Sequence, residues 1–206
     1  MLPPRTPSPT PGHRPRTRAW SRILGSSPTP ALSPTRFHNS VHNAASGYWS
    51  IGTGNRLAST AIAGQDATFA TAVLEAAALA IAERGIVLLV THDVAALPPL
   101  DAVCPNRQPF AAGLIFAAAP VAADWLPVRI TRVAHTGGWP PPAARWLQGL
   151  GNENPSARGI PLLAAIAGVA AWPVILPISP ATGVRIDRRD GNAAAGQIDA
   201  GSGVSS

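Results

Sequence analysis

The chain has 206 residues, of which 46% are apolar, so it can bury one core of good size but not two. All 16 basic residues are arginine, and six of them lie in the first 36 residues, where there is no acid. From Phe37 onward ten arginines balance ten acids, so the net charge of +6 belongs to the N-terminal stretch. This distribution argues against a basic nucleic-acid-binding face on a folded domain.

The two ends of the chain have the composition of disordered segments. Residues 1–32 are rich in proline and arginine and lack the apolar run of a secretory signal, and residues 190–206 are mostly glycine, alanine and serine. We therefore expect one domain over residues 33–189, between a disordered leader and a disordered tail. The single cysteine, Cys104, cannot form an internal disulfide, which favours a cytoplasmic protein with a free thiol. The bias toward arginine, alanine, glycine and proline is typical of a GC-rich bacterial genome.

The first part of this domain predicts a helix, a strand and a second helix. Apolar residues at spacings of three and four indicate a helix over residues 37–49, with His38 and His42 together on another face. Residues 57–64 predict a short buried strand. The helix that follows, over residues 65–84, is apolar on nearly every side, so we expect it to be buried between two layers.

The second part predicts mostly strands. Residues 86–94 form a continuous apolar run typical of a fully buried strand. Since no helix separates this run from the next one, the two are expected to be antiparallel neighbours. The other predicted elements are a strand at 109–119, a strand at 128–134, turn structure at 136–146, a helix at 152–168, and strands at 174–178 and 183–188. Together these elements predict an alanine-rich α/β domain.

Two features of the sequence each suggest a function of their own. His38 and His42 have the spacing of two metal ligands on one helical face, so a metal-dependent or other hydrolase could use them together with Asp93. The 19 uncharged residues 160–178 approach the length of a bilayer span, which would suit a small membrane-associated protein. The prolines inside that segment instead favour its division into a helix and a strand.

A motif in the stretch from Ser33 to Gln65 is more specific. Residues 43–54 read NAASGYWSIGTG, which is similar to the pattern N-x-A-A-G-x-x-S-I-x-x-G of the β-ketoacyl synthases, with one extra residue before the glycine. The chain thus resembles the N-terminal half of these synthases, in particular the short ketoacyl synthase-like proteins found beside aryl-polyene and polyketide-type genes. The predicted order of one helix and two strands over residues 65–119 also matches the family.

The resemblance implies a fold and the place of a nucleophile. The fold is a thiolase-like half-domain, the N-terminal half of a ketoacyl synthase, with a mixed sheet and a buried central helix. In the family a cysteine opens this helix, where the helix dipole and backbone amides favour a thiolate and an oxyanion. Counting from the shared glycine places Gln65 at that position, and an amide cannot attack a thioester. Chain-length factors, the non-condensing partners of synthases, also have glutamine there.

The function implied by the resemblance is that of a non-catalytic, chain-length-factor-like subunit in fatty acid, aryl-polyene or polyketide-type biosynthesis. We expect no catalytic residue, cofactor or metal, and neither nucleic acid nor a membrane as a partner. The implied partners are an intact ketoacyl synthase and an acyl carrier protein, in a homo- or heterodimer. Because the helix at 65–84 needs cover on both sides, we also expect a second subunit to meet residues 86–94 or their neighbours.

Overall fold

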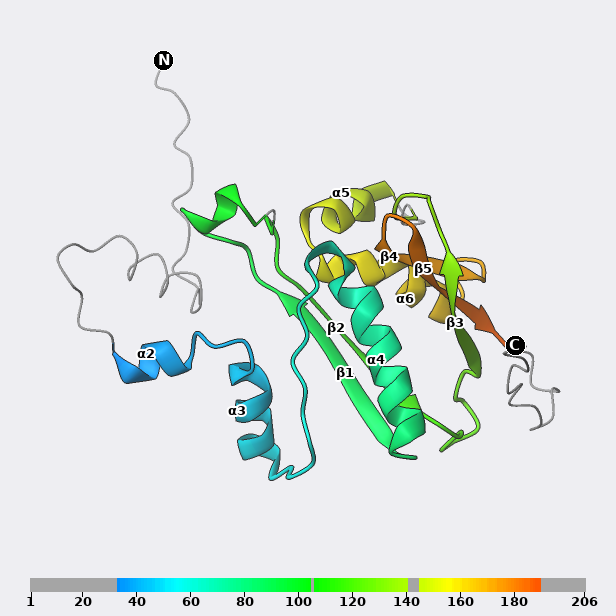
Figure 1. Ribbon diagram of the computed structural model, residues 1–206, viewed down its shortest axis with the longest axis horizontal. Coiled ribbons are helices and arrows are strands. Elements are labelled where there is room, and N and C mark those ends of the chain that lie inside the picture. The colour runs from blue at the N-terminus through cyan, green and yellow to red at the C-terminus, as the bar shows by residue number, and fades with distance from the viewer. Residues whose placement is uncertain (1–32, 105, 141–144, 190–206) are drawn as a thin grey trace, which may run out of the picture.

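The computed structural model describes residues 33–104, 106–140 and 145–189. A long helix, α4, lies between two small sheets (Figure 1). Two short helices over residues 34–53 precede it, and we call them the arm. The leader and tail expected at residues 1–32 and 190–206 lie outside the described residues. In chain order the elements are α2 (Pro34–His38), α3 (Ala44–Thr53), η1 (Gln65–Ala67), α4 (Thr68–Ala82), β1 (Ile86–Asp93), η2 (Leu100–Ala102), β2 (Phe110–Ala117), β3 (Val128–Ala134), α5 (Arg145–Glu153), η3 (Ser156–Gly159), α6 (Ile160–Ile166), β4 (Val174–Ser179) and β5 (Thr182–Arg188).

The first sheet is a ribbon of β1 and β2, which pair antiparallel over their whole length. Both strands and their pairing confirm the sequence-based prediction. On one face, Leu89 and Leu114 pack against the core beside α4. On the other face, Leu88 and Val90 are exposed, so the prediction of a fully buried strand is wrong. Among the described residues, no layer covers this outer face of β1. The continuous apolar sequence of the strand does not indicate which of its faces is covered.

The second sheet has the order β3-β5-β4, with both pairs antiparallel. It confirms the strands predicted at 128–134, 174–178 and 183–188, including the pairing of the last two. The sequence predicts one mixed sheet. The described strands instead form two antiparallel sheets, with α4 between them. The architecture is that of an α/β half-domain around a central helix.

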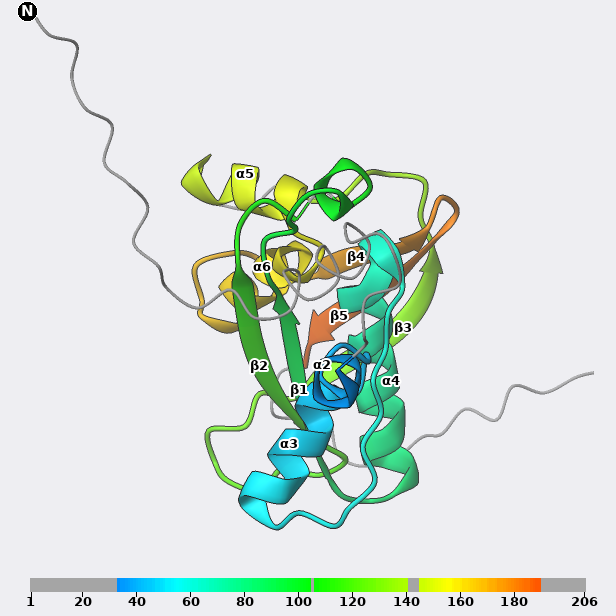
Figure 2. The same cartoon turned by 90° about the vertical axis from the view of Figure 1, so that its left-hand side faces the viewer.

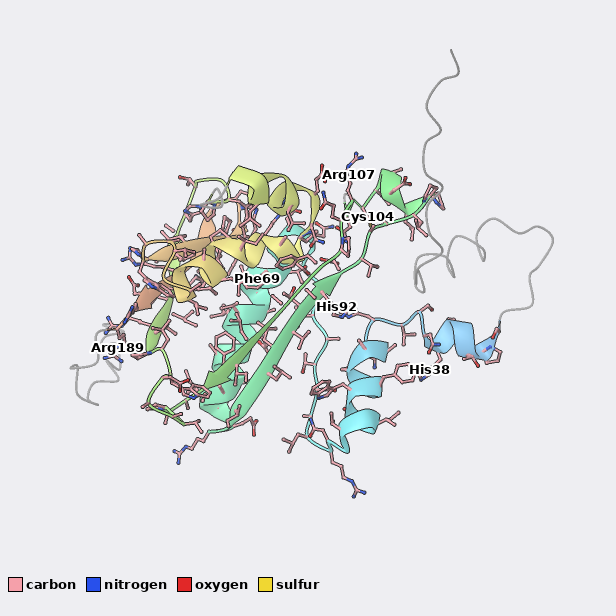
Figure 3. All side chains as sticks on the ribbon, turned by 180° about the vertical axis from the view of Figure 1, so that it is seen from behind. His38, Phe69, His92, Cys104, Arg107 and Arg189 are labelled. Atoms are coloured by element: carbon pink, nitrogen blue, oxygen red, sulfur yellow. The ribbon has the colours of Figure 1, made fainter. Side chains whose placement is uncertain are left out.

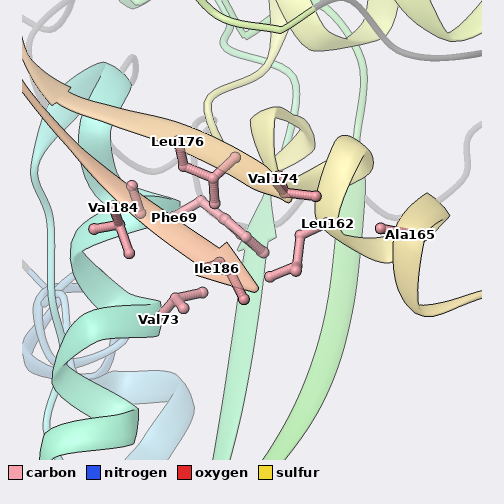
Figure 4. Close-up of a cluster of buried hydrophobic side chains, with 9 residues drawn as sticks. Phe69, Val73, Leu162, Ala165, Val174, Leu176, Val184 and Ile186 are labelled. Atoms are coloured by element: carbon pink, nitrogen blue, oxygen red, sulfur yellow. The ribbon is translucent and has the colours of Figure 1, made fainter. Parts of the chain in front are cut away.

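The core forms where α4 meets the second sheet and α6. Phe69, in the first turn of α4, is fully buried at its centre, and side chains from β4, β5 and α6 surround it (Figure 4). Gly159 of η3 lies so close to the Phe69 ring that any Cβ there would overlap it. The buried apolar residues of this cluster are Phe69, Ala70, Val73, Leu162, Ala165, Val174, Leu176, Val184 and Ile186.

The N-terminal part of the fold differs from its prediction in two places. The helix expected at 37–49 is broken into α2 and α3 by a turn, in which the Ser40 hydroxyl donates a hydrogen bond of 2.6 Å to the carbonyl of Phe37. Such a local bond competes with the helical pattern. The buried strand expected at 57–64 is wrong, because nearly all of these residues are exposed and the segment pairs with no described strand.

The helical region after β3 is also divided differently. The sequence analysis expects turn structure at 136–146 and a helix at 152–168, whereas α5 begins at Arg145 and ends at Glu153. Pro155 then separates α5 from η3, which continues into α6. Prolines suit the first turn of a helix as well as a loop, so the proline-rich stretch before α5 was ambiguous.

Candidate functional site

Gln65 lies in the turn that starts the central helix. It is the first residue of η1, which continues directly into α4, and its side chain is exposed. Its φ of 51° is in the left-handed region, which is uncommon for a residue that carries a Cβ. The structure therefore places Gln65 at the positive end of the helix in a sharply turned backbone, where the resemblance places a nucleophile.

Thr68 holds this turn in place. Its hydroxyl donates a hydrogen bond of 2.7 Å to the carbonyl of Gln65 and accepts one of 2.9 Å from the backbone N–H of Gly64. The first residue of α4 thus binds the two consecutive residues at the start of the turn, Gly64 and Gln65. Asp66 adds a negative charge to this first turn, which the helix dipole favours.

An arginine from a distant part of the chain contacts the first turn of the central helix. Arg158 of η3 forms an ion pair of 3.0 Å with Asp66, and its guanidinium lies 4.8 Å from the centroid of the Trp139 ring. The Arg158 side chain is only 16% exposed, and its Nε is buried without a hydrogen-bond partner. These contacts join the start of the central helix to η3 and to the loop after β3.

Arg158 was not predicted as a site residue, although its sequence context is unusual. It is the only charged residue between Glu153 and Arg185. A single charge inside a long neutral stretch of a folded domain needs a partner, because burying an unpaired charge is costly. Only the fold could show that this partner is Asp66, 92 positions earlier by sequence number.

A second polar cluster lies where β1 ends. The Asp93 carboxylate accepts hydrogen bonds of 2.6 Å from the hydroxyl and 3.1 Å from the backbone N–H of Ser156, and one of 3.2 Å from Asn106. Thr91 donates a further bond of 2.7 Å to the Ser156 hydroxyl. Ser156 is 2% exposed, so it cannot reach a substrate and instead fastens η3 to β1.

The histidines of the metal or hydrolase alternative do not form a site with Asp93. His38 ends α2, with its ring edge-on to Tyr48 at 6.2 Å between centroids, while His42 lies in the turn before α3. Figure 3 shows His38 on this arm and His92 on the ribbon. Among the described residues, no group of three or more His, Cys, Asp or Glu could hold a metal ion. The alternative is therefore not supported by this part of the chain.

The segment on which the membrane alternative depends is not a single helix in the structure. Residues 160–178 are divided between α6 and β4, with Gly168 in a left-handed turn between them, so they form no single spanning helix. One described helix, over residues 65–82, is long and apolar enough to cross a bilayer, and 33% of it is buried. In this structure it packs between the two sheets, as the core helix of a folded domain does.

Neither Cys104 nor the ion pair of Arg185 and Asp187 is part of the Gln65 turn. Cys104 lies exposed in the loop after η2. Among the described residues, the clear pKa shifts belong to one pair on β5, where the hydrogen bond between the side chains lowers the pKa of Asp187 and raises that of Arg185. The role that the resemblance assigns to Gln65 remains a prediction.

Comparisons with known proteins agree with this architecture. The family model described as "Beta-ketoacyl synthase, N-terminal domain" matches residues 22–136. No curated protein sequence matches the chain. A solved structure, a ketosynthase (ApeO) in complex with its chain length factor (ApeC) from Xenorhabdus doucetiae, contains a similar chain, with 18% sequence identity and a TM-score of 0.57. The match covers 83% of this chain and 63% of that one.

The structural match shows a shared fold, that of a ketosynthase, in which this chain spans less than two thirds of the matched chain. The expectation of a thiolase-like half-domain is thereby confirmed. The family model covers more than half of the 206 residues and includes the arm, the Gln65 turn, the central helix and the ribbon. The chain therefore belongs to the family of β-ketoacyl synthase N-terminal domains.

Proposed function

We propose that this chain is a non-catalytic, chain-length-factor-like subunit that works with a ketosynthase and an acyl carrier protein. Its pathway would be of the aryl-polyene, fatty acid or polyketide type, in the cytoplasm of a bacterium. The observation that carries the proposal is Gln65, which occupies the turn at the start of the central helix. An acyl-transfer nucleophile at this place would need a thiol or hydroxyl, and an amide has neither.

The site supports a binding or positioning role. The Gln65 turn is held by Thr68 and braced through Asp66 by Arg158, so its backbone is fixed although the side chain cannot be acylated. An exposed amide can donate and accept hydrogen bonds. Family membership and the similarity to a chain of a ketosynthase–chain length factor complex support a ketosynthase as the partner.

The proposal is tested by co-expression of this chain with a ketosynthase and an acyl carrier protein from the genome that encodes it. We expect a tag on this chain to retain the ketosynthase through purification, and product formation to require both subunits. Gln65→Ala should retain the complex, because the side chain is exposed and its turn is held by backbone and Thr68 contacts. A ketosynthase that neither co-purifies nor changes its products when this chain is omitted would contradict the proposal.

A further inference from the structure

Arg158 is held more firmly than the partner in its ion pair. Its side chain is largely buried, whereas the side chain of Asp66 is 63% exposed. The Arg158 guanidinium lies 4.8 Å from the centroid of the Trp139 ring, and this cation–π contact restricts where it can point. A buried charge is costly unless it is paired, and the Asp66 carboxylate supplies that pairing at 3.0 Å. In this pair, the arginine is therefore the fixed end and the aspartate is the end that is placed.

The backbone that carries Arg158 is itself fixed at the end of the ribbon. Ser156 at the start of η3 binds the Asp93 carboxylate of β1 through both its hydroxyl and its backbone N–H. Just before η3, the buried Asn154 donates a hydrogen bond of 2.7 Å to the carbonyl of Gln108, close to the start of β2. Figure 1 and Figure 2 show the segment between α5 and α6, which contains η3, at this end of the ribbon. Both strands of the ribbon thus determine where η3 lies.

The Gln65 turn needs support from outside. Its left-handed backbone is unfavourable for a residue with a Cβ and persists only where neighbouring groups hold it. Thr68 provides hydrogen bonds from within the same turn. Asp66, which directly follows Gln65, adds a charged contact to a distant segment of the chain. The turn is therefore connected to η3 through Asp66 and Arg158, and through η3 to the ribbon.

We propose that Arg158 is a positioning residue for the Gln65 turn, and that η3 holds it for this role from the end of the ribbon. The positive charge of Arg158 fixes the Asp66 carboxylate, and the backbone next to Gln65 is fixed with it. The inference deepens the proposed function, since it names what holds the turn on which that function rests. The contacts themselves lie within one chain, so they can be tested without a ketosynthase.

Hydrogen–deuterium exchange of the full chain tests this role. Exchange over residues 64–69 reports opening of the turn, and strands β4 and β5 are the internal reference for unfolding of the domain. We expect Arg158→Met to raise exchange over residues 64–69 at least roughly fivefold relative to this reference, because it removes the ion pair but keeps apolar packing on Trp139. Arg158→Lys keeps the charge and should stay within about twofold of the wild type. A role in packing alone predicts the opposite order of the two variants.

Asp66→Asn approaches the same pair from its exposed end and serves if Arg158→Met does not fold. It removes the charge of the carboxylate and keeps its shape, so exchange over residues 64–69 should rise as in Arg158→Met. The two changes together should act no more strongly than the stronger of them alone, because both remove one ion pair. Glu75→Gln is the matched control, since Glu75 is an exposed carboxylate on the same helix outside this pair.

Ser156→Ala tests whether η3 transmits the hold of the ribbon. This change should raise exchange over residues 64–69 relative to the reference strands, and it should add less in the Arg158→Met background than in the wild type. Equal increments in both backgrounds would show that η3 does not act through Arg158 and would overturn the inference. It would also be overturned if exchange over residues 64–69 did not change in Arg158→Met and Asp66→Asn, or if it rose more in Arg158→Lys than in Arg158→Met. A ketosynthase that does not bind the wild-type chain would contradict the proposed function alone.

Discussion

Gln65 combines an unusual backbone with an inert side chain. A residue with a Cβ in the left-handed region costs roughly 1–3 kcal/mol and persists only where its surroundings hold it. Here the Thr68 hydroxyl donates a hydrogen bond to the carbonyl of Gln65 and accepts one from the N–H of Gly64. The turn is thus maintained at a position where glutamine cannot attack a thioester. This agrees with the non-condensing role that we propose for the chain.

Gly159 is the residue whose size the core restricts most directly. A Cβ at this position would overlap the fully buried ring of Phe69, so Gly159→Ala forces either the ring or η3 to move. Overpacking of this kind costs about 1–3 kcal/mol. We expect the thermal midpoint to fall by roughly 2–4 °C for each kcal/mol, as measured by calorimetry.

Gly149→Ala provides the control for this prediction. Gly149 lies in α5, and a Cβ there would meet nothing within 4 Å. Alanine should stabilise the helix slightly, by roughly 0.5–1 kcal/mol, because it restricts the unfolded chain. If both variants had the same midpoint, the close packing of η3 on Phe69 would be disproved.

At the level of elements, the contact between β1 and η3 depends on Ser156. Replacing it with alanine removes the 2.6 Å hydrogen bond to the Asp93 carboxylate and leaves Thr91 without its acceptor. Removing one partner of a buried polar pair costs about 1–3 kcal/mol. We expect Ser156→Ala to lower the urea midpoint by a corresponding amount without changing the m-value.

Ser46→Ala is the matched substitution on the surface. The Ser46 hydroxyl donates only to the carbonyl of Asn43 within the exposed arm, at 2.9 Å. Its loss should change the free energy of unfolding by no more than about 0.5 kcal/mol. Equal effects of the two serine substitutions would mean that the Asp93 cluster does not stabilise the fold.

The strands show what the sequence could predict at this scale. β1, β2 and β4 have continuous apolar runs, and apolar and charged residues alternate along β5, so these patterns were enough to identify the four strands. Residues 57–64 have a similar apolar composition but no ladder partner, and a strand needs a neighbour that its own sequence does not encode. The Gln65 turn was located by resemblance, whereas Arg158 depends on a tertiary contact between distant segments.

For the whole molecule, the cover of the central helix differs from the expectation. The sequence analysis predicts that a second subunit is needed to cover α4, because the chain was expected to supply too few layers. In the structure, the ribbon packs on one side of α4 and the β3-β5-β4 sheet on the other. The apolar surface that remains uncovered is instead the outward face of the β1–β2 ribbon, which includes Leu88 and Val90.

The exposed apolar surface of the ribbon and the Gln65 turn belong to different elements of the molecule. Under the proposed function, the exposed apolar outward face of the β1–β2 ribbon bears on assembly, and the Gln65 turn at the start of α4 bears on acyl transfer. Each can be tested without the other. We propose that the chain keeps the turn of a ketosynthase at the start of α4 and lacks the nucleophile.

Intact mass spectrometry after incubation with an acyl thioester tests this claim most directly. We expect the wild-type chain to gain no mass, and Gln65→Cys to gain one acyl group, because a thiol at the start of α4 is favoured as a thiolate. Peptide mapping would locate that group. A covalent acyl adduct on the wild-type chain, at Cys104 or at any serine, would contradict the account.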